Sequence, residues 1–177
     1  MESINYYANS NLETYRLIPH YYFQTVPDKT FVSVIGKSNE NTCNDWKNKF
    51  SFRLPNDRFV VDYRRNHWTF DADGLVENRM FEDIYEYFVF VFTPDKEDME
   101  SLNKMIDMTE RCPEKIIFCF YSGYNGMLFS DNLYAFLTKI GNDLISKGCK
   151  YFNTVDDIIY YLISQDRLKE KELYEHE

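Results

Sequence analysis

The sequence has few Gly and Pro residues, which interrupt secondary structure, and few Cys and His residues, which bind zinc. Of its 177 residues, only six are Gly, five are Pro, four are Cys and three are His. The cysteines are Cys43, Cys112, Cys119 and Cys149, which lack the paired CxxC spacing of a zinc site. We therefore expect no metal and no cofactor, and reduced thiols in a protein of the cytoplasm.

The sequence also lacks an excess of positive charge and lacks long apolar runs, and both absences limit the partners that the protein is expected to bind. Lys and Arg number 20 against 29 Asp and Glu, for a formal charge of -9, which argues against binding to DNA, RNA or an anionic membrane. No apolar run is as long as a bilayer span, and the N-terminus shows no signal-peptide pattern, so we expect no membrane association. The charge still allows a small phosphorylated ligand held by a few arginines.

The chain is rich in hydrophobic segments that alternate in type along the sequence. Short runs rich in β-branched and aromatic residues predict strands at 30–36, 58–63, 87–94, 115–121 and 149–152. Amphipathic segments predict helices at 41–54, 76–86, 95–112, 131–148 and 154–165, the first of them capped by Asn41 or Thr42. This order predicts an α/β fold, a three-layer α/β/α sandwich with a doubly wound, mostly parallel five-stranded sheet.

The predicted domain is flanked by two segments of different character. Residues 1–29 are polar and tyrosine-rich, and we expect an N-terminal arm that packs on the single α/β domain of residues 30–165. Residues 166–177 form a highly charged C-terminal tail, either a helix extension or a frayed end.

In such sheets, ligands bind beyond the carboxyl ends of the strands, at the point where strand order reverses. The loops that start at Gly36, Tyr63, Thr93 and Ser122 therefore form the candidate site. Gly36, Lys37 and the following serine resemble part of a phosphate loop, but Phe31 stands where that motif needs its first glycine. Two interpretations remain: a tight turn that needs glycine, or backbone amides that approach a ligand.

The string "DYRRNHW" places Arg64, Arg65 and Trp68 directly after a predicted strand. A guanidinium group suits phosphate or carboxylate, and an indole can stack on a base. Neighbouring residues of a strand point to opposite sides, so at most one arginine is expected to face the ligand. The alternative is that both arginines pair with the protein's own carboxylates and that Trp68 covers the core.

Several carboxylates are candidates for acid-base or nucleophilic chemistry. Asp107 lies among apolar residues of a predicted helix, where burial would raise its pKa, unless it is an ordinary surface aspartate. Glu82, Asp83 and Glu100 have the same two interpretations, a reactive group or a solvated helix face.

Taken in order, several strings resemble the nucleoside 2-deoxyribosyltransferase-like superfamily over about residues 30–163. These strings are "VSVIG", the "DW" of Asp45 and Trp46, "DYRRNHW", the pair Phe81 and Glu82, "FVFVFTP" and "TVDDIIYYL". The resemblance implies the same sandwich fold and cleavage or transfer at an N-glycosidic bond.

In that family a glutamate in the helix after the third strand attacks the anomeric carbon, and an aspartate commonly assists the departing base. Here the best register places Lys104 at the glutamate position, and Tyr63 replaces the proline of the arginine motif. The resemblance thus leaves Asp107 or Glu100 as the nucleophile and Glu82 or Asp83 for proton transfer. The residues it implies for substrate binding are Gly36, Lys37, Trp46, Asp62, Arg64, Arg65 and Trp68.

The sequence therefore predicts a nucleoside- or nucleotide-binding protein that cleaves or transfers at an N-glycosidic bond. The alternative is a catalytically inactive relative that sequesters a nucleotide or docks on a protein partner or a second copy of itself. A signalling-type sandwich unrelated to nucleosides is the third interpretation.

Overall fold

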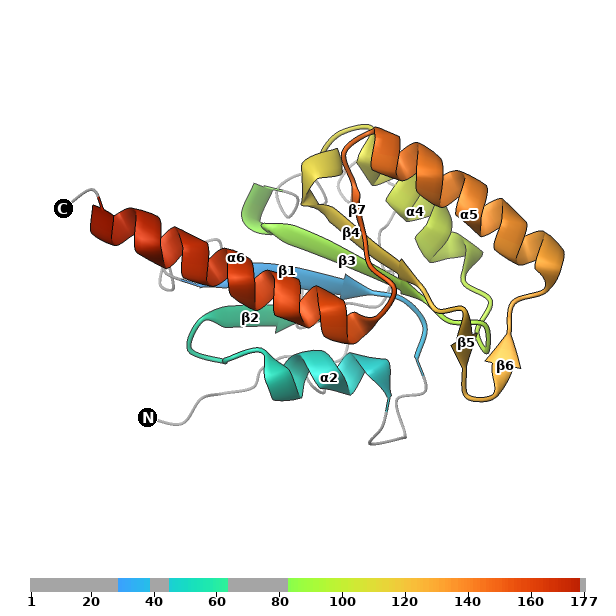
Figure 1. Ribbon diagram of the computed structural model, residues 1–177, viewed down its shortest axis with the longest axis horizontal. Coiled ribbons are helices and arrows are strands. Elements are labelled where there is room, and N and C mark those ends of the chain that lie inside the picture. Colours follow the sequence, from blue (N-terminus) through green and yellow to red (C-terminus); the bar gives the residue numbers. More distant parts are fainter. Residues whose placement is uncertain (1–28, 39–44, 64–82, 176–177) are drawn as a thin grey trace, which may run out of the picture.

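The computed structural model describes residues 29–38, 45–63 and 83–175 of the chain. Its centre is a five-stranded, all-parallel sheet in the order β2-β1-β3-β4-β7, which confirms the predicted fold class (Figure 1). The strands are β1 (Thr30–Ile35), β2 (Phe59–Asp62), β3 (Tyr87–Phe92), β4 (Ile116–Phe120) and β7 (Lys150–Tyr151). The helices are α2 (Trp46–Arg53), α4 (Met99–Thr109), α5 (Asp131–Ser146) and α6 (Val155–Glu175). A short 3-10 helix, η2 (Pro113–Lys115), precedes β4.

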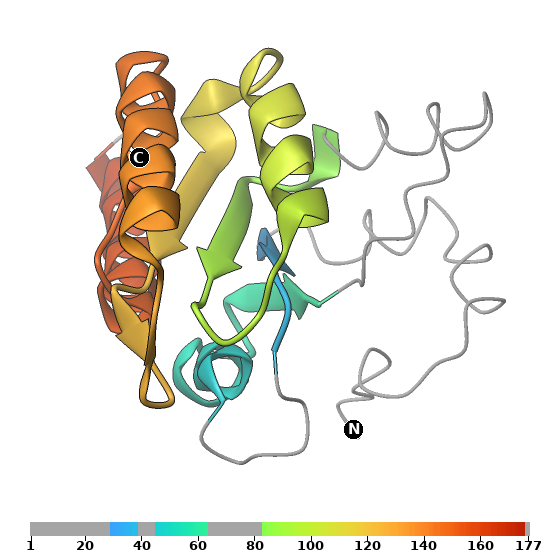
Figure 2. The same cartoon turned by 90° about the vertical axis from the view of Figure 1, so that its right-hand side faces the viewer.

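Alternation along the strands gives the sheet two different apolar faces, and a helical layer lies on each (Figure 2). One face is mainly aromatic, for example Phe88 and Phe90 of β3, and packs against α4 and α5. The other face is mainly aliphatic, for example Val89 and Val91, and packs against α2 and α6. The sheet is therefore buried on both sides, as the continuous apolar strands predict.

The structure corrects two details of the sequence prediction. The loop after β4 contains a two-stranded hairpin, β5 (Gly123–Tyr124) and β6 (Met127–Leu128). Its turn residues Asn125 and Gly126 both have positive φ, 50° and 75°, as a type I′ turn requires. Helix α2 begins later than expected, with Asp45 as its N-cap instead of Asn41 or Thr42.

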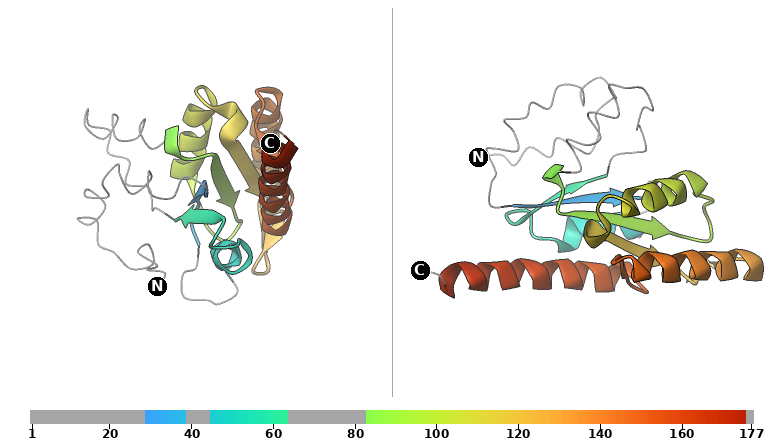
Figure 3. Two further views of the ribbon diagram at one scale, coloured as in Figure 1. Left: turned by 90° about the vertical axis from the view of Figure 1, so that its left-hand side faces the viewer. Right: turned by 90° about the horizontal axis from the view of Figure 1, so that it is seen from above.

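The charged C-terminal segment is a helix extension as far as Glu175, which is one of the two alternatives that the sequence left open. Helix α6 continues without a break to Glu175 and runs past the strands when viewed from above (Figure 3). Arg58 donates to both carboxylate oxygens of Asp166, at 2.9 and 3.2 Å, and so attaches this half of α6 to the loop before β2. Side-chain pairing thus extends the helix beyond its apolar stripe. In the described part of the chain, no helix is long and apolar enough to cross a membrane.

Candidate functional site

The candidate site is the carboxyl edge of the sheet at β1 and β3, where the strand order reverses. From β1 the chain continues to β2 on one side, and β3 then lies on the other side of β1. The loop after β1, the start of α2 and the loop after β3 meet at this edge, which is where open α/β sheets bind ligands.

Gly36 ends β1 in a backbone conformation that only glycine adopts readily. Its φ is +145°, and a Cβ built on it would lie 2.3 Å from the backbone oxygen of Val91 in β3. The same Cβ would lie 3.2 Å from the indole of Trp46. Close packing of β1 against β3 and α2 therefore requires the glycine, which supports the tight-turn interpretation of this residue.

Asp98 ties the loop after β1 to the start of α4. Its Oδ1 accepts a hydrogen bond from the Ser101 amide at 3.2 Å, and its Oδ2 accepts from the Lys37 amide at 3.0 Å. The Lys37 ammonium group donates to the Glu97 carbonyl oxygen at 2.8 Å. Asp98 is buried, and each of its oxygens has a backbone donor, so its carboxylate holds two loops together.

Asp45 and Tyr124 connect the start of α2 to the hairpin after β4, which lie side by side in Figures 1 and 2. The Tyr124 hydroxyl donates to Asp45 Oδ1 at 3.1 Å and accepts from the Trp46 amide at 3.1 Å. Although Asp45 is the N-cap of α2, its side chain makes no capping hydrogen bond. The tyrosine hydroxyl therefore satisfies the amide of Trp46, one of the first helical amides, which have no partner within the helix.

A second contact fastens the hairpin to the loop after β3. Asn125 Nδ2 donates to Asp95 Oδ2 at 3.0 Å. Burial, together with the nearby carboxylates of Asp45 and Asp95, raises the pKa of Tyr124 to about 12. The Tyr124 hydroxyl thus stays protonated near neutral pH and serves as a hydrogen-bond donor.

Polar atoms at this edge are buried without a hydrogen-bond partner. Among the described residues they include Ser38 Oγ, Asp45 Oδ2 and Trp46 Nε1. Because Gly36 abuts the Trp46 indole, the end of β1 and the start of α2 adjoin, and these atoms belong to one region of the fold. Buried polar atoms are nearly always paired in folded proteins, so three such atoms make this strand edge the candidate site.

The structure brings some of the predicted binding residues to this edge and places others elsewhere. Gly36 and Lys37 lie at the strand end, as expected. Trp46 also lies there, but its side chain is buried against Phe50, so at most its indole N–H is available to a ligand. Asp62 ends β2 on the other side of β1 and accepts a hydrogen bond from the buried Tyr85 hydroxyl.

The predicted nucleophiles occupy exposed positions on α4. Asp107 has a 71 % exposed side chain and forms an ion pair with Arg111 at 2.7 Å, so it is a surface aspartate. It lies eight residues after Met99, or about 12 Å along the helix axis. Glu100 is exposed in the first turn of α4, close to the strand ends. Lys104 is half-buried between them.

Four of the predicted site residues, Arg64, Arg65, Trp68 and Glu82, lie outside the described residues. Asp83 is described, is helical and is exposed, four residues before β3.

Two residues whose side chains form hydrogen bonds at the carboxyl edge, Asp98 and Tyr124, were not predicted as site residues. Asp98 appears in the sequence as one of several acidic residues before a helix, and Tyr124 as one of fifteen tyrosines. Asp45 carried a signal, because an aspartate directly before the helical Trp46 is a preferred capping residue. Its side chain instead accepts a hydrogen bond from Tyr124 of the hairpin, which is distant in sequence.

In the described ranges, no group of three or more His, Cys, Asp or Glu side chains is arranged to hold a metal ion. Comparisons of the chain with protein-family models, with curated proteins and with solved structures found no significant match.

We expect Tyr85→Phe to lower the free energy of unfolding by about 1 to 2 kcal/mol, because it removes the hydroxyl donor to the buried Asp62 carboxylate. The ring contacts with Phe31 and Phe88 remain. Urea denaturation measures the effect. The matched control is Tyr160→Phe on the exposed face of α6, expected to stay within about 0.5 kcal/mol of the parent. Equal effects of the two changes would contradict a structural role for the Tyr85 hydroxyl.

We expect stability to fall as pH rises from 10 to 12. Burial raises the pKa of Tyr63 and of Tyr121 from 10.0 to about 12. A raised folded-state pKa contributes stability that is fully present below the unfolded-state value and is lost as pH approaches the folded-state value. Denaturant titrations across this range, followed by tyrosinate absorbance, measure the loss. Tyr63→Phe is expected to make the fall shallower, and an unchanged slope would contradict the assignment.

Proposed function

We propose that this protein binds a nucleoside or nucleotide at the carboxyl edge of β1 and β3. The observation that carries the proposal is the set of buried, unpartnered atoms there, namely Ser38 Oγ, Asp45 Oδ2 and Trp46 Nε1. They supply an acceptor, a donor and a hydroxyl that can act as either. A base and its sugar present the complementary groups, and the resemblance to deoxyribosyltransferase-like proteins supports the same ligand class.

The described carboxylates favour binding without turnover. Asp98 is held by two backbone amides, Asp107 is paired with Arg111 on the surface, and Lys104 stands where the family has its glutamate. An ammonium group cannot stabilise a developing oxocarbenium cation as a carboxylate does. The alternative that the sequence analysis described, a catalytically inactive relative, is therefore our leading proposal.

Cleavage at the N-glycosidic bond is the second candidate, because one carboxylate remains close to the strand ends. Glu100 is exposed in the first turn of α4, two residues after the buried Asp98. It is the residue that we would assign as nucleophile if turnover occurs.

The two proposals are separated by one experiment on the wild-type chain. A panel of ribo- and deoxyribonucleosides and their monophosphates is screened by thermal unfolding, and each sample is then analysed chromatographically for free base. A ligand at a hundred times its Kd should stabilise the protein by about 2.7 kcal/mol, which corresponds to a Tm increase of about 5 to 10 °C. A stabilising compound that stays intact supports binding without turnover.

Free base, lost in Glu100→Gln and retained in Asp107→Asn, would instead establish the enzyme. If no compound changes Tm and no base is released, both proposals are wrong.

A further inference from the structure

We propose that Asp45 is the residue that recognises the ligand, by accepting a hydrogen bond on Oδ2 from a hydroxyl or amino group of the ligand, and that Tyr124 is its positioning residue. The inference rests on the proposed function and deepens it, because it names the ligand chemistry that the site takes.

Only one of the two oxygens of the buried Asp45 carboxylate has a structural contact. Asp45 is 2 % exposed, and it provides no side-chain cap for α2. One oxygen accepts from Tyr124, and the other is buried without a partner in the described structure. A buried carboxylate oxygen without a donor is unfavourable, so a carboxylate retained there needs a donor from another molecule.

Asp98, the other buried aspartate discussed at this edge, differs from Asp45 in its hydrogen bonding. Asp98 is also an N-cap, and it does cap its helix, with a backbone amide on each oxygen. The two residues share burial, helix position and strand edge, and differ in that only Asp45 has an open acceptor. The open oxygen therefore does not follow from the fold class or from the position alone.

Tyr124 fixes the orientation of the Asp45 carboxylate. Its hydroxyl is held by the Trp46 amide, so its proton is directed at Asp45 Oδ1, and Oδ2 is left for the ligand. The hairpin that carries Tyr124 is itself held by Asn125 and Asp95. This chain of contacts gives the carboxylate one orientation before any ligand arrives, which lowers the entropic cost of binding.

The ligand group is identified by its hydrogen-bonding chemistry. An ionised carboxylate oxygen only accepts, so the partner atom must be an O–H or an N–H. In dinucleotide-binding α/β sheets, an acidic residue accepts from a sugar hydroxyl. An exocyclic amine of a base is a donor of the same kind. Analogues that lack one donor at a time distinguish the two sources.

The test compares Asp45→Asn with the wild type in isothermal titration, with adenosine, guanosine, cytidine and uridine as probes. For the nucleoside that binds, Asp45→Asn should raise Kd about tenfold. The 2′-deoxy, the 3′-deoxy and the deaminated analogues follow. The analogue that lacks the recognised donor should bind the wild type about tenfold more weakly, and should bind the variant and the wild type equally. Equal Kd values of wild type and Asp45→Asn for every analogue would overturn the inference while leaving the proposed function intact.

Unfolding of the unliganded proteins provides a readout that does not depend on any ligand. Asp45→Asn removes an incompletely paired buried charge, so its Tm should equal or exceed that of the wild type, whereas Asp98→Asn should lower Tm. A fall in Asp45→Asn as large as in Asp98→Asn would mean that Asp45 is structural, and the inference would be wrong.

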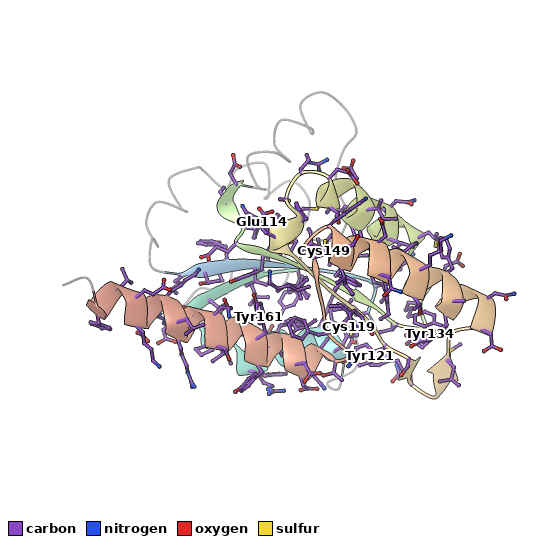
Figure 4. All side chains as sticks on the ribbon, turned by 45° about the horizontal axis from the view of Figure 1, so that its top comes forward. Glu114, Cys119, Tyr121, Tyr134, Cys149 and Tyr161 are labelled. Atoms are coloured by element: carbon purple, nitrogen blue, oxygen red, sulfur yellow. The ribbon has the colours of Figure 1, made fainter. Side chains whose placement is uncertain are left out.

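Tyr121→Phe is the matched control for Tyr124→Phe. The Tyr121 hydroxyl also accepts from a helix-terminal amide, that of Val155 at 3.1 Å, and the two tyrosine rings are in contact. Figure 4 shows Tyr121 near the start of α6. Both changes should lower Tm, and only Tyr124→Phe should weaken nucleoside binding, by about threefold to tenfold. Equal affinities of the two variants would exclude Tyr124 as a positioning residue.

If none of the nucleosides binds the wild type, the proposed function fails, and this inference fails with it.

Discussion

Gly36→Ala is expected to lower the free energy of unfolding by about 4 kcal/mol, the largest effect that we predict for a single substitution. Two penalties add. At φ +145° an L-residue is strained, and the new Cβ would lie 2.3 Å from the Val91 backbone oxygen. That oxygen belongs to the central strand β3, so relief requires β1 and β3 to move apart, which disturbs the sheet on both faces.

Guanidinium denaturation followed by circular dichroism measures the change. Gly126→Ala is the matched control, because its φ is also positive, +75°, while a Cβ there would meet nothing within 4 Å. The control should lose only about 1 kcal/mol, the cost of backbone strain alone. If the free energy of unfolding falls equally in the two variants, the close approach of Gly36 to β3 adds nothing to the cost of Gly36→Ala. Because the substitution also displaces the Trp46 indole, nucleoside binding by the folded fraction should weaken.

Asp98→Asn is expected to lower the free energy of unfolding by about 2 kcal/mol. An amide can still accept from the Ser101 N–H, and asparagine is as good an N-cap as aspartate. Its NH2 group would then face the Lys37 N–H, which loses its acceptor. The loss therefore measures the connection between the loop after β1 and α4, separately from the capping of α4.

Asp157→Asn is the control for this change. Asp157 lies in the first turn of α6, is exposed, and its side chain accepts from the Thr154 hydroxyl at 2.7 Å. Its replacement should change stability by no more than about 0.5 kcal/mol. Thermal and denaturant unfolding of the pair give the difference, and an Asp98→Asn protein as stable as the wild type would show that Lys37 finds another acceptor.

The architecture could be predicted from the sequence because parallel strands buried on both faces need continuous apolar residues. The string "YFVFVF" of β3 is typical of a strand buried on both faces, since it is short, apolar throughout and flanked by predicted helices. The same alternation predicted a candidate site in the loops after the strands, whereas the strand order that puts the reversal at β1 and β3 came from the structure. Gly36 was identified because it starts one of those loops.

The hairpin β5–β6 was not predicted, although its turn residues Asn125 and Gly126 are a strong local signal for one. Its strands are only two residues long, too short for hydrophobic alternation to show. The continuation of α6 to Glu175 was left open because it depends on ion pairs such as that between Arg58 and Asp166, residues 108 positions apart.

By itself, the sequence determined the order of strands and helices and a sheet buried on both faces, because these follow from the periodicity of apolar residues, which is a local property. Only the tertiary structure decided which polar groups at that edge are open. Asp98 and Asp45 look alike in sequence, as aspartates before a helix. The first has both oxygens bonded to backbone amides, and the second has one oxygen turned to Tyr124, 79 positions away, and the other without a partner in the described structure. Whether a buried polar atom has a hydrogen-bond partner depends on its neighbours in space, and the sequence pattern does not show which residues those are.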